Sequence, residues 1–90
     1  MKRVHLIICG DVVGVGYRAW VLRLAQNFRL VGWVKNRQNR TVELVAEGEP
    51  EVLEKLIVAC KKGPDVAWIE HVEITWLPAS GEFVNFTVVY

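Results

Sequence analysis

Apolar positions along the chain change period several times, and each change predicts an element of secondary structure. Branched and apolar residues fill both faces of Arg3–Cys9, which is typical of a central strand. After a loop over residues 10–17, Ala19–Leu30 carries apolar residues at the i, i+3, i+4, i+7 spacing of one helix face. Gly32 is expected to mark the end of this helix. The chain therefore opens with a strand, a loop and an amphipathic helix.

Two strands joined by a polar turn follow the first helix. Val31–Lys35 is predicted as a strand, Asn36–Arg40 as a turn, and Thr41–Glu47 as a second strand with clean alternation. Adjacent strands with a five-residue polar connection predict a hairpin. On the alternating strand, Glu43 and Glu47 fall on the face opposite the apolar residues. We therefore expect both carboxylates to be solvated.

The second half of the chain repeats the order of helix and strand. Pro50 suits the first position of a second helix, and Gly63-Pro64 ends that helix. Trp68–Trp76 is predicted as a strand whose apolar phase changes near Glu70-His71, which indicates a bulge. A loop then leads to a last β segment, Phe83–Tyr90, with apolar residues in phase.

These predictions give the order β-α-β-β-α-β with an extra strand at the C-terminal end. Two helices on one face of a mainly antiparallel sheet define a ferredoxin-like α+β sandwich. Ninety residues without internal repeats or linkers predict a single domain over residues 1–90. The order of elements leaves open whether the loop after the first strand meets the hairpin.

Composition narrows the classes of partner. The net charge is +1, from 11 basic and 10 acidic residues, so no long-range attraction to nucleic acid or an anionic membrane is expected. No stretch is long enough to span a bilayer, and the short apolar run of the first strand lacks the cleavage site of a secretory leader. We expect a cytoplasmic, monomeric protein without nucleic-acid or membrane partners.

The residues of the common catalytic and metal sites are few and scattered. Cys9 and Cys60 fall on the apolar phases of their segments and are predicted to be buried thiols, bridged only if strand and helix pack within disulfide distance. Ser80 has no histidine near it in sequence, and His5 lies two pleats from Cys9, so neither forms a nucleophile–base pair. His71 and the cysteines show no ligand spacing, so no metal site is predicted.

The glycine-rich loop before the first helix is the most informative segment. Gly10, Gly14 and Gly16 let the backbone turn sharply and let a ligand approach the main chain. Main-chain N–H groups in such a loop, together with a helix N-terminus, favour an anion. Arg18 follows with a planar cation that matches phosphate oxygens. The simplest ligand for this arrangement is a phosphate-like anion.

Phosphoryl transfer needs few side chains, because positioning and electrostatic stabilisation supply most of the catalysis. A carboxamide such as that of Asn36, at the start of the polar turn, can hold a water molecule in line for attack. Taken alone, however, the loop and Arg18 also fit an ordinary strand-to-helix turn, and Asn36 also fits an ordinary turn residue.

Two separate motifs resemble those of the acylphosphatases. Residues 10–18, Gly-Asp-Val-Val-Gly-Val-Gly-Tyr-Arg, resemble the signature loop of that family. Gly32–Asn36 followed by Thr41-Val42-Glu43 resembles its second motif. The end of the second helix, the spaced apolar positions of residues 67–76 and the final aromatic–aliphatic strand match in order, so the resemblance covers nearly the whole chain.

The resemblance implies hydrolysis of the carboxyl–phosphate bond of acyl phosphates, with release of carboxylate and inorganic phosphate, and without metal or cofactor. It implies that Arg18 binds the phosphoryl oxygens and that Asn36 orients the attacking water. It also implies that main-chain N–H groups of a phosphate-binding loop share the phosphate. Those loop residues are Val13, Gly14, Val15, Gly16, Tyr17 and Arg18.

Two departures from the family pattern leave alternatives open. Val13 stands where the family usually has glutamine, and the hairpin turn ends in Asn39-Arg40 rather than in a glycine. A positive φ at Arg40 would cost about 1 kcal/mol or more. A domain that binds phosphate or carbamoyl groups without turnover is therefore one alternative. An RNA-binding module on the same fold is another, although the paired aromatic and basic strand pattern is missing.

Overall fold

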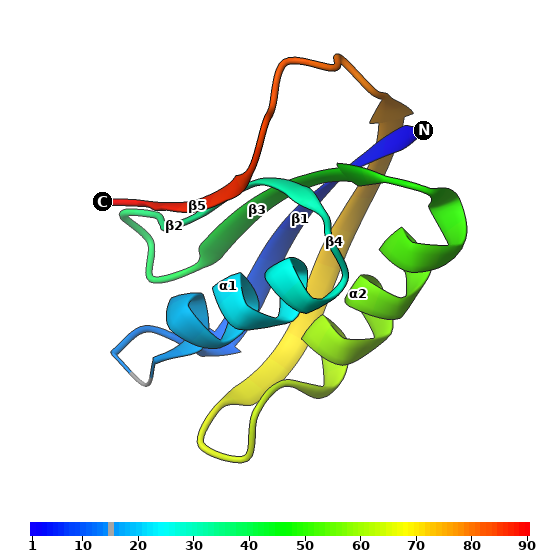
Figure 1. The fold of residues 1–90 in the computed structure, drawn as a ribbon. Coiled ribbons are helices and arrows are strands. Elements are labelled where there is room, and N and C mark those ends of the chain that lie inside the picture. Colours follow the sequence, from blue (N-terminus) through cyan, green and yellow to red (C-terminus); the bar gives the residue numbers. More distant parts are fainter. Residues whose placement is uncertain (15) are drawn as a thin grey trace.

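The computed structural model describes residues 1–14 and 16–90, and it forms one mixed sheet covered on one face by two helices (Figure 1). The elements in chain order are β1 (Lys2–Asp11), α1 (Tyr17–Asn27), β2 (Val31–Asn36), β3 (Val42–Gly48), α2 (Pro50–Lys62), β4 (Trp68–Pro78) and β5 (Phe86–Val89). The strand order is β4-β1-β3-β2-β5. This arrangement confirms the ferredoxin-like α+β prediction and the extra strand.

Pairing within the sheet follows the predicted topology. Strands β1 and β3, β1 and β4, and β2 and β3 pair antiparallel, so the predicted hairpin is confirmed. Strand β5 instead runs parallel to β2 at the opposite edge of the sheet from β4. This strand is shorter than expected, because residues 83–85 belong to the connection and Val84 is exposed.

The predicted bulge lies in β4. Cys9 pairs with His71, but Gly10 pairs with Ile69, so Glu70 is the extra residue. Gly10 has φ +142°, and a Cβ atom there would overlap the carbonyl oxygen of Trp68. The two strands therefore approach closely only because position 10 has no side chain.

The first helix differs from the prediction at both ends. It begins at Tyr17 rather than Ala19, and it ends at Asn27 rather than Leu30. Arg29 takes the left-handed position after the helix, with φ 57°, and the N–H of Leu30 donates to the carbonyl of Ala25 in the manner of a Schellman ending. Gly32 is therefore not the helix stop. It lies within β2, where a Cβ atom would overlap the carbonyl of Val45.

Both helices pack on the face of the sheet to which alternate apolar residues point. Side chains from all layers form one buried core, and the largest fully buried side chain belongs to Tyr17. Its hydroxyl donates to the carbonyl oxygen of Cys60 at 3.1 Å, which joins α1 to α2. No helix in the described part of the chain is long and apolar enough to cross a membrane.

The two cysteines are free thiols in different environments. Cys60 is fully buried in α2, as predicted. Cys9 is only half-buried, so the expectation of a second buried thiol is wrong. Its strand is central, but residues alternate across it, and Cys9 points to the sheet face that carries no helix.

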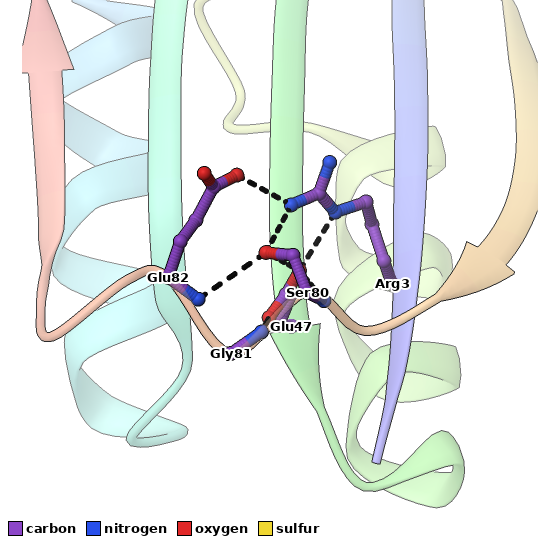
Figure 2. A network of polar contacts seen from close by, with 5 residues as sticks. All are labelled: Arg3, Glu47, Ser80, Gly81 and Glu82. Carbon is purple, nitrogen blue, oxygen red and sulfur yellow. Dashed lines mark hydrogen bonds and ion pairs between the residues drawn. The ribbon is translucent and has the colours of Figure 1, made fainter.

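The expectation of a solvated Glu47 is also wrong. Glu47 lies on the sheet face without helices, as its phase predicted, but its side chain is only 1% exposed. The connection between β4 and β5 folds over it, and the N–H groups of Ser80 and Gly81 donate to its carboxylate at 2.8 and 3.1 Å (Figure 2). Arg3 Nε donates to the same carboxylate at 2.7 Å. Glu43, four residues earlier on the same strand, is half-buried, and its carboxylate lies 2.6 Å from His5 Nε2.

These contacts determine the charge state of Glu47. Burial alone would raise the pKa of this carboxyl, but the N–H groups of Ser80 and Gly81, the guanidinium of Arg3 and the Ser80 hydroxyl outweigh it and lower the pKa to about 2. The carboxylate is therefore ionised at neutral pH and fastens the connection to the sheet.

Candidate active site

The loop between β1 and α1 forms one wall of the candidate site. Val12 is buried beneath the loop, while Gly14 and Gly16 have φ 82° and 78°, which is the left-handed region that favours glycine. Gly16 is the N-cap of α1. Val15 lies outside the described residues. The loop thus runs directly into a helix N-terminus, where main-chain N–H groups lack intrahelical acceptors.

Because α1 begins at Tyr17, both Tyr17 and Arg18 lie in its first turn, and their side chains take different positions. Tyr17 buries its side chain in the core, so only its main chain faces the loop. Arg18 lies in the first turn of the helix and is half-buried. Its guanidinium carbon lies 5.0 Å from the centre of the Tyr90 ring, in a cation–π contact.

Asn36 approaches the same region from the sheet. It is the last residue of β2 and pairs with Val42, just before the hairpin turn. Its carboxamide oxygen Oδ1 is buried and has no hydrogen-bond partner among the described residues. A buried carbonyl oxygen of this kind is costly unless a donor such as water reaches it.

A small cavity joins these parts. It has a volume of about 190 Å³ and is lined from four directions, by Gly14 and Gly16 of the loop, Arg18 of α1, Asn36 of β2, and Val88 and Tyr90 at the last strand. The loop and the hairpin strand, whose proximity the sequence left open, therefore meet. The volume is below the roughly 300–1,000 Å³ of sites for drug-sized ligands, so it suits a group the size of a phosphate.

The last strand supplies lining residues that the sequence analysis missed. Val88 pairs with Val34, and the parallel pairing of β5 with β2 carries Val88 and Tyr90 to the cavity. Their sequence shows only an apolar strand. The parallel pairing with the strand that ends at Asn36 is the signal that identifies them, and it is a property of the tertiary structure.

A wider hollow adjoins the cavity beside the hairpin turn. It has a volume of about 690 Å³ and shares Asn36 and Tyr90 with the small cavity. Its other lining residues are Lys35, Arg37, Gln38, Asn39, Glu43 and Val89. Lys35 Nζ lies 3.8 Å from a Glu43 oxygen, so the hollow holds a carboxylate beside the basic residues Lys35 and Arg37.

The other nucleophile candidates lie outside this cavity. The hydroxyl of Ser80 donates to Glu47 at 3.0 Å and belongs to the network over the opposite sheet face. Burial raises the pKa of the Cys9 thiol, and the negative charges of Glu73 and Glu70 raise it further. A thiol with a raised pKa is a poor nucleophile. That neither residue forms a nucleophile–base pair stays a prediction.

Fold and cavity together define a ferredoxin-like protein with a small anion-sized site between a glycine loop and a central strand. A family model described as Acylphosphatase matches residues 4–88. The acylphosphatase of Methylococcus capsulatus is 42% identical over 99% of this chain and 97% of its own length. The chain belongs to the acylphosphatase family, which confirms the resemblance seen in its two motifs.

Solved structures agree with the family assignment. The crystal structure of acylphosphatase from Bacillus subtilis is similar with a TM-score of 0.96 and 33% identity, and all of both chains is covered. An acylphosphatase structure from Coxiella burnetii is similar with a TM-score of 0.91 and 32% identity, over 98% of this chain and 92% of that one. The likeness therefore extends through the fold from end to end.

Proposed function

We propose that this protein hydrolyses the carboxyl–phosphate bond of acyl phosphates in the cavity between the glycine loop and Asn36. The observation that carries the proposal is the buried, unpartnered Oδ1 of Asn36 lining the same cavity as Arg18. One group offers a fixed positive charge, and the other offers an acceptor for a water proton. That pair is what phosphoryl transfer to water requires.

Arg18 and the loop hold the phosphoryl group in this proposal. The guanidinium donates to the phosphoryl oxygens, and the main-chain N–H groups of Val13, Gly14, Gly16 and Tyr17 share the negative charge. Val15 completes the proposed set of donors. Gly14, Gly16, Tyr17 and Arg18 line the small cavity at the helix N-terminus, which supports donors that are held in place by the fold before the substrate binds.

Asn36 positions the attacking water. The water oxygen forms the new bond to phosphorus while the bond from phosphorus to the acyl oxygen breaks, and the carboxylate leaves. The water proton passes to an oxygen of the phosphoryl group itself, so no protein base takes part. An arginine contact to the phosphoryl group, such as the one proposed for Arg18, accelerates phosphoryl transfer by roughly 10³–10⁵.

The departure at position 13 fits this mechanism. The side chain of Val13 is half-buried and packs against the core, so it offers no hydrogen bond where glutamine would. Its main-chain N–H is unaffected by the change of side chain. We expect the phosphate site to persist with one polar contact fewer.

The acyl part of the substrate extends, in this proposal, into the wider hollow beside the hairpin turn. The hollow shares Asn36 and Tyr90 with the phosphate-sized cavity, which supports release of the carboxylate toward that side. Among the described residues, its lining holds two basic residues, Lys35 and Arg37, against the single carboxylate side chain of Glu43, and this balance favours an anionic leaving group.

Hydrolysis of acetyl phosphate in EDTA, with inorganic phosphate as a competitor, tests the proposal. We expect Arg18→Ala to lower kcat/KM by about 10³ or more and to abolish phosphate inhibition. Asn36→Ala should keep phosphate inhibition but lower kcat by about 10², the cost of a misplaced reactant. Arg23→Ala is the matched control, because Arg23 is an exposed arginine of the same helix.

The outcomes separate the roles of the two residues. Normal turnover by Arg18→Ala would refute the proposed role of Arg18 in phosphate binding. An equal loss of kcat/KM in Arg23→Ala would show that any positive charge on this helix has the same effect. Phosphate binding without turnover in the unmodified protein would leave a binding domain rather than an enzyme.

We also propose that the protein acts as a cytoplasmic monomer. Two free thiols support a compartment that keeps cysteine reduced. Light scattering coupled to gel filtration should give the mass of one chain, 10.3 kDa, and a mass of two chains would contradict the monomer.

A further inference from the structure

Three metal-binding side chains meet on the sheet face that carries no helix. Cys9 of β1 lies directly opposite His71 of β4 in the strand pairing, and Glu73 follows two residues along on the same face. One ligand atom from each of the three residues lies within 4.8 Å of the other two. The Nε2 atom of His71 and a Glu73 oxygen are 3.7 Å apart.

We propose that Cys9, His71 and Glu73 form a binding site for a divalent transition-metal ion of the zinc class. Sulfur, imidazole nitrogen and carboxylate oxygen are the three protein ligand types that zinc takes. A thiolate and a carboxylate together balance the charge of a divalent ion, and the neutral imidazole adds none. Water fills the fourth position of a tetrahedral ion.

The spacing suits such an ion after small side-chain movements. Metal–ligand distances of about 2.0–2.3 Å place tetrahedral ligand atoms about 3.6 Å apart. The His71 and Glu73 side chains are 55% and 66% exposed, so both can rotate toward the half-buried Cys9 thiol. The backbone need not move, because the strand pairing already sets Cys9 against His71.

The position in the sheet leaves the site accessible. The three residues lie on β4, an edge strand of the described sheet, and on its neighbour β1, and the His71 and Glu73 side chains are exposed on the face without helices. The bulge at Glu70 immediately precedes His71 and sets the register that brings His71, rather than its neighbour, opposite Cys9. Because the three donors are 62 and 2 residues apart along the chain, their sequence spacing gives no metal motif.

The same face carries a natural control. His5 Nε2 and a Glu43 oxygen also lie 2.6 Å apart, on neighbouring strands. Among the described residues, however, no cysteine joins this pair to make a group of three metal ligands. If any histidine–carboxylate pair on this sheet bound the ion, this pair would do so as well. The proposed site therefore predicts a requirement for the thiol.

Titration of the reduced, full-length protein with Zn²⁺ and with Co²⁺ tests the site. We expect one ion per chain, and for Co²⁺ a sulfur-to-metal charge-transfer band in the near ultraviolet. Cys9→Ser and His71→Gln should each weaken Zn²⁺ binding by at least about 100-fold, since loss of outer-sphere partners alone costs 10–100-fold. His5→Gln and Glu43→Gln should leave the affinity unchanged. Far-ultraviolet circular dichroism verifies that each surface variant is folded.

Several outcomes would overturn the site. These are an affinity unchanged in Cys9→Ser, a cobalt spectrum without the sulfur band, an equal loss in His5→Gln, or one ion for every two chains. The measurement does not depend on hydrolysis, so the proposed catalytic function stands or falls separately.

Discussion

The carboxylate of Glu47 makes the stability of this protein depend on pH in the acidic range. Its pKa is lowered from the ordinary value of 4.5 to about 2. The two values differ by about 2.5, which at about 1.4 kcal/mol for each pH unit corresponds to about 3 kcal/mol of folding free energy. Because the pKa is lower in the folded state, this contribution is complete above about pH 5 and is lost as the pH falls toward 2.

Replacing Glu47 with glutamine allows this contribution to the folding free energy to be measured. The amide keeps the shape and one acceptor oxygen but removes the charge that Arg3 and the N–H groups of Ser80 and Gly81 contact. We expect Glu47→Gln to lower the free energy of unfolding by about 3 kcal/mol at pH 7. Near pH 2 the two proteins should be almost equally stable. A loss of this size is a large share of the 5–15 kcal/mol typical of a small domain.

Urea unfolding at pH 7, 5, 4 and 3, followed by tryptophan fluorescence, measures the difference. Glu82→Gln is the matched control, because Glu82 also contacts Arg3, at 2.8 Å, but its side chain is 62% exposed. An exposed ion pair contributes at most about 1 kcal/mol, so this variant should stay close to the unmodified protein. A gap between Glu47→Gln and the unmodified protein that stays constant from pH 7 to pH 3 would refute the reasoning.

Two further predictions concern the hairpin turn and the last strand. Arg40 has φ 63°, so Arg40→Gly should raise the free energy of unfolding by up to about 1 kcal/mol in urea, whereas Arg40→Ala should not. Equal stabilities of the two variants would count against backbone strain. Tyr90→Leu removes the ring that faces Arg18 and should weaken inhibition by inorganic phosphate about 2–5-fold, whereas Tyr90→Phe should not. Unchanged inhibition in Tyr90→Leu would show that the ring does not position Arg18.

Local patterns predicted the fold well where residues near in sequence decide it. Alternation along β3, the helical spacing of α1 and the boundary residues of α2 identified the elements, and the change of phase at Glu70 identified the bulge. Alternation shows which face a residue occupies but not what covers that face. Glu47 was therefore expected in solvent, although a connection more than thirty residues away buries it.

The site was predicted in part, for a similar reason. Arg18 and Asn36 were identified by their motifs, but their meeting depends on the packing of α1 against β2 and β5. Tyr90 reaches the cavity only through the parallel pairing of β5. The Cys9–His71 pair likewise arises from strand register, which sequence spacing does not reveal.

Strand β3 connects the candidate active site at one end to the stabilising contacts of Glu47 at the other. Its first residue, Val42, pairs with Asn36 beside the cavity, and Glu47, near its other end, pairs with Arg3. Five residues of extended strand span about 17 Å. Substitutions near Glu47 can therefore change the stability of the protein toward acid or heat while the geometry around Asn36 stays the same. That end of the strand is the place to engineer stability without lowering the rate of hydrolysis.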